Sequence, residues 1–195
     1  MIQARTESVY LIQSNKEKCR TLFLKQNLTE DEMIDFYVSL HLVMEVSLNA
    51  LFRNLSLMQI QKSVNKLEIA KDIDNINFIN KATLFIYNYH YDFKGRTDEA
   101  DKYHKVIEYL KAFSGVRNKL LHGHSISTLY ENQENQQDSE TRKLLQQNAI
   151  ENQINLFKKI FEGLSFYVDH VDSSITESGK NSFKEEYLDD SFLEK

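Results

Sequence analysis

The chain has 195 residues, with five glycines, one cysteine and neither proline nor tryptophan. Because turns in sheet proteins draw heavily on Gly and Pro, this composition excludes a turn-rich β fold and predicts an all-α protein, a single bundle of about five or more helices. Cys19 stands alone, which excludes an internal disulfide and a cysteine-based zinc site. The formal net charge of −5 argues against a protein that coats nucleic acid by charge alone, but it leaves room for a local basic site.

Two helices are predicted in the first quarter of the chain. The first runs from about Ile2 to Lys25, and Lys16 interrupts its inner stripe. The apolar members of that stripe are Ile2, Val9, Ile12, Cys19 and Phe23. The second begins at a capping box, with Thr29 as N-cap and Glu32 three residues on, and continues to about residue 53. Its apolar body predicts the central and most buried helix.

The middle of the chain gives weaker patterns. Residues 57–70 and 76–90 predict two further helices, although the aromatic and β-branched residues of the second would equally suit a strand. Helical periodicity resumes over residues 98–113. We expect an interruption at Ser114 and Gly115, followed by a short helix to His122 with Ser114 as its N-cap.

A polar stretch at 125–140 predicts an exposed loop, and residues 139–172 predict a long last helix. Its inward residues are Leu144, Ile150, Ile154, Phe157, Phe161, Leu164 and Val168. Residues 1–172 would thus form one helical domain, and residues 173–195 a polar tail that is either loosely ordered or docked on a partner or on the domain itself.

The chain shows no membrane or export pattern. The first 25 residues contain no apolar block, which argues against a secretory signal, and nowhere do 18 apolar residues stand together. We therefore expect a soluble cytoplasmic protein.

One segment, residues 113–123, carries a more specific signal. On a helical wheel Arg117 falls inside the apolar arc formed by its neighbours, and Asn118 and His122 fall on the edge of that arc. A guanidinium cannot be neutralised, so an Arg117 aimed at the core or at an interface needs an anionic or hydrogen-bonding partner.

The second helix offers such a partner. His41, Glu45 and Asn49 stand at i, i+4 and i+8, so they share one narrow stripe on an apolar helix. Polar residues in this setting are costly unless they face each other, water or a ligand. Our hypothesis is that this stripe looks toward Arg117 and that Glu45 is its counter-ion.

This combination resembles the HEPN superfamily of small helical domains, most of which are associated with RNA cleavage. The family motif is an Arg, often followed by a polar residue, and then a His after four to six residues; Arg117, Asn118 and His122 match it. In the family, the motif helix packs on a long helix with a polar or acidic residue, the place that Glu45 holds here. The resemblance covers about residues 1–172 by architecture but only some ten residues by motif.

The resemblance implies a metal-independent endoribonuclease of the toxin or phage-defence type, without a cofactor. The ribose 2′-hydroxyl would attack the adjacent phosphate and expel the 5′-oxygen. His122 would act as general acid or base, Arg117 would neutralise charge on the phosphate, and Asn118 would orient the phosphate or His122. A homodimer would bring two motifs to one cleft, and an antitoxin or defence-system partner is expected.

The chain departs from one pattern of the family. Some toxin members continue His-x-Tyr, where a partner nucleotidyltransferase modifies the Tyr, but here that position is His124. We therefore do not expect this mode of regulation.

Charge gives the RNA hypothesis modest support. Residues 94–124 carry seven Lys and Arg against four Asp and Glu, so this segment is basic within an acidic chain. We take Lys105, Lys111 and Lys119 as candidates for RNA contact. The aromatic residues of the segment would either stack on bases or lie buried, namely Tyr103, Tyr109 and Phe113.

Simpler interpretations stay open. Arg117 and Glu45 would make a structural ion pair without chemistry, and His41 would be a packed core histidine. His122 and His124 would hold a metal with nearby acids, although no second cluster supports this. The domain would otherwise be a non-catalytic HEPN module that binds a nucleotide, a nucleic acid or a partner protein, or a helical bundle with a chance motif.

Overall fold

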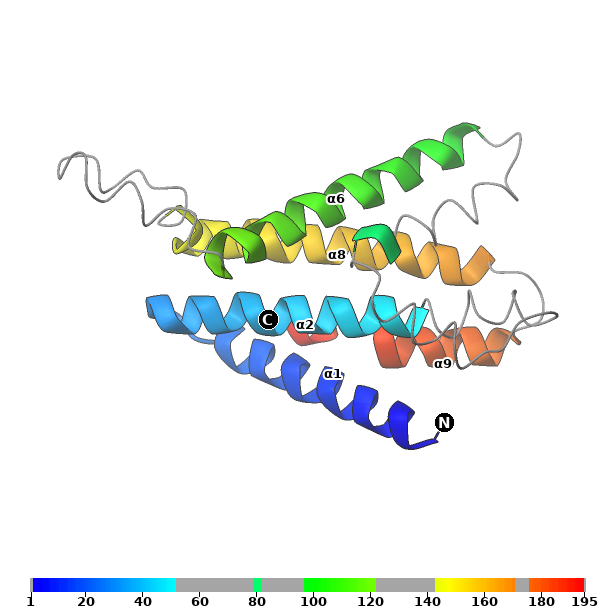
Figure 1. The fold of residues 1–195 in the computed structure, drawn as a ribbon, viewed down its shortest axis with the longest axis horizontal. Helices are drawn as coiled ribbons and strands as arrows, with labels where there is room; N and C mark the ends of the chain where they lie inside the picture. Colours follow the sequence, from blue (N-terminus) through cyan, green and yellow to red (C-terminus); the bar gives the residue numbers. More distant parts are fainter. Residues whose placement is uncertain (1, 52–78, 82–96, 122–142, 171–175, 195) are drawn as a thin grey trace.

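The computed structural model describes residues 2–51, 79–81, 97–121, 143–170 and 176–194, and the side chains of residues 2–7, 97–104, 121 and 170 are not among them. Within these residues the chain is helical and has no strand, which confirms the all-α class. The long helices lie side by side in a bundle (Figure 1). The two helices predicted at 57–70 and 76–90 lie outside the described residues, apart from a helical segment at 79–81.

The first two helices form an antiparallel hairpin. Helix α1 spans Ile2–Phe23 and α2 spans Glu30–Leu51. The Thr29 amide donates to Glu32 Oε2 at 3.1 Å, and the Glu32 amide donates to Thr29 Oγ1 at 3.3 Å, which confirms the predicted capping box. The acids of the first turn also oppose the positive end of the helix dipole.

Helix α2 is the centre of the bundle. It contacts α1, α6, α8 and α9 and buries residues on most of its faces, as its composition predicts. By length and hydropathy α2 would be able to span a membrane, the one helix among the described residues of which this is true. Since 61% of its apolar window is buried inside the fold, we interpret it as the core helix of a soluble protein.

Helices α6, Thr97–Leu121, and α8, Gln147–His170, form a second antiparallel pair above α2 (Figure 1). The interruption predicted at Ser114 is wrong, because α6 continues through Ser114 and Gly115 without a break. Instead of capping a new helix, Ser114 Oγ donates to the Lys111 carbonyl at 3.2 Å within the same helix.

Helix α8 starts later than the predicted residue 139. Residues 143–146 form a helical turn and a bend, and the continuous helix begins at Gln147. The carbonyl of Leu144 in this turn accepts a hydrogen bond of 2.7 Å from the Tyr37 hydroxyl, so the entry to α8 is held against α2. The predicted inward residues of α8 are buried, whereas Leu144 is only half-buried.

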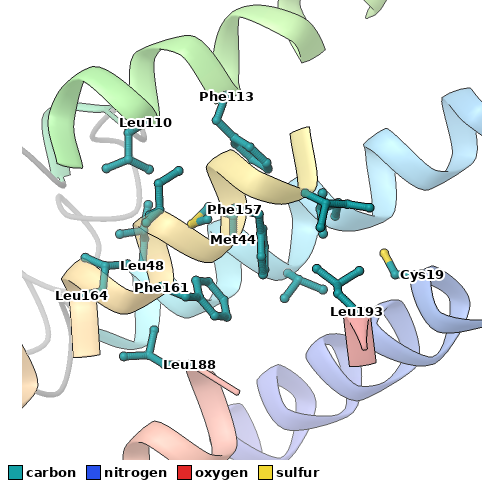
Figure 2. Packing of buried hydrophobic residues seen from close by; sticks show 14 of the residues in the cluster. Cys19, Met44, Leu48, Leu110, Phe113, Phe157, Phe161, Leu164, Leu188 and Leu193 are labelled. Carbon is teal, nitrogen blue, oxygen red and sulfur yellow. The ribbon is translucent and has the colours of Figure 1, made fainter. Parts of the chain in front are cut away.

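The C-terminal segment is part of the core. Residues Glu177–Tyr187 form α9 and Ser191–Leu193 form the 3₁₀ helix η4. Figure 2 shows Leu188 and Leu193 pointing into the same cluster as residues of α2 and α8. Ser47 Oγ of α2 also donates to the Tyr187 carbonyl at 2.6 Å. A loosely ordered tail is therefore wrong for residues 176–194, which dock on the domain because their apolar side chains complete its core.

The same segment explains the polar gap in the stripe of α1. Lys16 Nζ lies 3.5 Å from Asp189 Oδ2 and 5.6 Å from the centre of the Phe192 ring. Burial lowers the pKa of Lys16, while Asp189 and Asp190 act to raise it. Lys16 thus occupies an inward position because the C-terminal segment supplies it with a carboxylate and an aromatic ring.

Candidate functional site

The motif residues lie near the C-terminal end of α6. Arg117 is one turn beyond Phe113, on the helix face that is buried earlier in α6. Arg117 and Asn118 are nevertheless exposed, because the last fully buried residue of α6 is Ser114. The prediction that Arg117 is aimed at the core is therefore wrong for the single chain, whereas an exposed position at an interface stays a prediction.

Phe113 anchors this end of α6 to α2. Its ring is 1% exposed and stacks on the His41 imidazole, with centroids 5.7 Å apart and planes inclined by 7°. Gln153 Nε2 of α8 donates to the Phe113 carbonyl at 2.9 Å. In Figure 2 the Phe113 side chain points from α6 toward α8 and α2. The backbone just before the motif is thus fixed from both neighbouring helices.

His41 is a buried and neutral histidine. Burial lowers its pKa to about 4, and the nearby positive charge of Arg117 lowers it further in the same direction. His41 Nε2 lies 3.9 Å from Glu45 Oε2, which is too long for a hydrogen bond. At neutral pH the two side chains therefore form no ion pair. The effect of Arg117 on His41 places the guanidinium within electrostatic range of α2.

The expected ion pair of Arg117 and Glu45 is not among the ion pairs of the described residues, although both side chains are described. The direction of the helices gives the reason. Helices α2 and α6 run in opposite directions (Figure 1), and His41 faces Phe113. One turn further along α6, at Arg117, therefore corresponds to one turn earlier along α2, near Tyr37, whereas Glu45 lies one turn later.

The polar stripe of α2 does not act as one unit. His41 stacks on Phe113, Glu45 is half-buried, and Asn49 Oδ1 accepts a hydrogen bond of 2.8 Å from Lys81 Nζ. Lys81 is 5% exposed, so its ammonium is held within the fold. The sequence gave no sign of this contact, because Lys81 and Asn49 are far apart in the chain and Lys81 lies in a segment without a clear helical pattern.

The predicted RNA contacts divide by exposure. Lys105, Lys111 and Lys119 are all exposed on α6, but they point to different sides of the helix. Tyr109 is half-buried, with Lys159 Nζ of α8 at 5.4 Å from its ring centre. The burial of Phe113 excludes it from base stacking, and the Tyr103 side chain lies outside the described residues.

His122 and His124 also lie outside the described residues, since the description of α6 ends at Leu121. Their predicted roles in catalysis, and the alternative of a metal site built on them, stay predictions. In the parts of the chain that the structure does describe, His, Cys, Asp and Glu form no group of three or more that would hold a metal ion.

Comparisons with protein-family models, curated proteins and solved structures found no match for the chain.

Proposed function

We propose that this chain is a HEPN-like, metal-independent endoribonuclease of the cytoplasm, active as a homodimer and controlled by an antitoxin or defence-system partner. Arg117 neutralises charge on the scissile phosphate, Asn118 orients it, and His122 transfers the proton. No cofactor takes part. The proposal rests on the motif, whose first two residues belong to the described part of the chain.

The observation that carries the proposal is the exposure of Arg117 and Asn118 on the last turns of an anchored helix. A guanidinium with a structural role would be buried against a carboxylate, but the described ion pairs do not join Arg117 to Glu45. An exposed guanidinium beside an amide is open to a phosphate, which it binds through planar, paired donors.

The stack of Phe113 on His41 supports the same proposal. A catalytic arginine acts only if its backbone is held in place, and Phe113 is fixed one turn before Arg117 by His41 and by Gln153. We therefore assign His41 to positioning, not to proton transfer, since its pKa of about 4 leaves it neutral at working pH.

A cleavage assay in the presence of a chelator tests the proposal. The wild-type protein should cut RNA, and His122→Ala should lower the rate by about 10²- to 10⁴-fold, the usual contribution of a positioned proton transfer. Arg117→Ala should lower it similarly. Lys18→Ala, which removes an exposed lysine of α1 paired with Asp35, is the matched control and should leave the rate unchanged.

If the wild-type and His122→Ala proteins are equally inert while both bind RNA and keep the same circular dichroism spectrum, the nuclease proposal fails. The non-catalytic binding module would then be the better account. Cleavage that persists in His122→Ala would also contradict the proposal, because the activity would belong to another site or to a contaminant.

A further inference from the structure

A solvent-open groove of about 400 Å³ runs along the seam between α6 and α8. Val106 of α6 and Gly163 of α8 meet in this seam, and a Cβ at Gly163 would collide with Val106 Cγ2. The missing side chain at Gly163 therefore lets the two helices approach closely, while the larger residues on either side of this contact form the walls of the groove.

Each end of the groove combines an aromatic ring with a lysine from the opposite helix. At one end, Lys159 Nζ of α8 lies 5.4 Å from the ring centre of Tyr109 of α6. Because α6 and α8 are antiparallel (Figure 1), Lys105 of α6 and Phe166 of α8 lie at the other end, beyond the contact of Val106 with Gly163. Both lysines are exposed and both rings are half-buried.

The charge of the groove is opposite to that of the chain as a whole. Lys105 and Lys159 face a single acid, Glu162, in a protein whose net charge is −5. Aromatic faces next to ammonium groups suit a ligand that alternates flat rings with anions, which is the chemistry of a single-stranded nucleic acid. An acidic peptide would satisfy the lysines but would leave the two rings without a stacking partner.

We propose that this α6–α8 groove binds single-stranded RNA next to the cleavage site, with bases stacked on Tyr109 and Phe166 and phosphates held by Lys105 and Lys159. Lys159 would exchange its exposed contact with the Tyr109 ring, which is weak, for a phosphate. Arg117 is eight residues after Tyr109 on the same helix, about 12 Å along the axis, so one RNA strand would reach both places. This inference rests on the proposed function.

Binding is measured with a fluorescein-labelled 2′-O-methyl RNA of about 12 nucleotides, by anisotropy over a range of salt concentrations. This RNA lacks the attacking hydroxyl, so its binding is read independently of cleavage. Lys105→Ala/Lys159→Ala should weaken binding about tenfold or more at low salt. It should also reduce the slope of log K against log salt by about 1.4, the loss expected for two phosphate contacts on a single strand.

The aromatic contacts are tested separately. Tyr109→Leu and Phe166→Leu should each weaken binding by about 5- to 100-fold, the usual effect of losing one base stack, with less change in salt dependence. The matched control, Lys18→Ala/Lys25→Ala, removes the same number of exposed lysines from the α1 end of the chain and should bind as wild type does. Circular dichroism and thermal melting check that each variant is folded.

The outcomes separate this inference from the proposed function. The groove assignment is overturned if its variants bind RNA as wild type does while cleavage still depends on His122. It is also overturned if a poly-glutamate peptide binds as tightly as RNA and loses the same affinity in the lysine variant. If RNA cleavage proves independent of His122 but the groove variants still lose RNA binding, the nuclease proposal alone fails.

Discussion

His41 is the residue whose environment has the clearest measurable consequence. Its pKa is about 4 in the folded chain and 6.5 as the model value, so the unfolded chain takes up a proton first as the pH falls. The stabilisation from neutral, buried His41 is present above pH 6.5 and is lost between 6.5 and 4. Burial is the main cause of this shift, and the positive charge of Arg117 adds to it.

Wild-type protein should therefore lose about 2 to 3 kcal/mol more of its free energy of unfolding than His41→Leu between pH 7 and pH 4.5. Denaturant titrations of both proteins at the two pH values measure this difference. Leucine changes packing equally at both values, so only the pH-dependent part is informative. Parallel pH profiles would show that His41 is not buried in its neutral form.

Cys19 gives a second prediction for a single residue. Its side chain is fully buried, and desolvation raises its pKa to about 12. We expect no reaction with a thiol reagent at pH 8 in the native protein and full reaction in denaturant, because only the thiolate is nucleophilic. Its stabilising contribution should fall as the pH rises above 9, the ordinary value. Rapid labelling of the native protein would contradict this burial.

Among the helices, the seam of α6 and α8 shows what sequence alone did not reveal. Periodicity predicted the buried faces of both helices, because the 3.6-residue repeat is a local property of each. It did not show that Ser114 and Gly115 would stay helical, since their low helix propensity is outweighed by packing against α2 and α8. Nor did it reveal the partners of Arg117 and Asn49, which depend on how antiparallel helices align.

The close approach at this seam predicts opposite effects of one substitution at two glycines. Gly163→Ala should destabilise the protein by about 1 to 2 kcal/mol, because the new methyl collides with the stiff Val106 side chain and this outweighs the gain in helix propensity. Gly115→Ala meets no atom within 4 Å and should stabilise α6 by up to about 1 kcal/mol. Thermal or denaturant unfolding measures both, and equal effects would contradict the seam geometry.

For the molecule as a whole, the C-terminal segment closes the core against α1 and α2. The sequence left open whether its apolar residues dock on the domain or on a partner, because an amphipathic segment does not specify its own binding surface. Phe192 is 5% exposed, and its ring is 5.8 Å from that of Phe157 and edge-on to it. The fold thus includes residues that a domain boundary at residue 172 would have removed.

Phe192→Ala should therefore lower the free energy of unfolding by about 3 to 5 kcal/mol, the usual cost of removing a buried phenylalanine side chain. Ser191→Ala changes an exposed neighbour and serves as the control. A loss below about 1 kcal/mol in Phe192→Ala, within the range of surface substitutions, would mean that the segment is not part of the core.

The central claim is that Arg117 and His122 cleave RNA through attack by the 2′-hydroxyl. Mass spectrometry of the products formed in the presence of a chelator tests it most directly, because this route leaves a 2′,3′-cyclic phosphate on one fragment and a 5′-hydroxyl on the other. We predict these two ends for the wild-type protein and no product from Arg117→Ala or His122→Ala. Fragments with 5′-phosphate and 3′-hydroxyl ends would contradict the account.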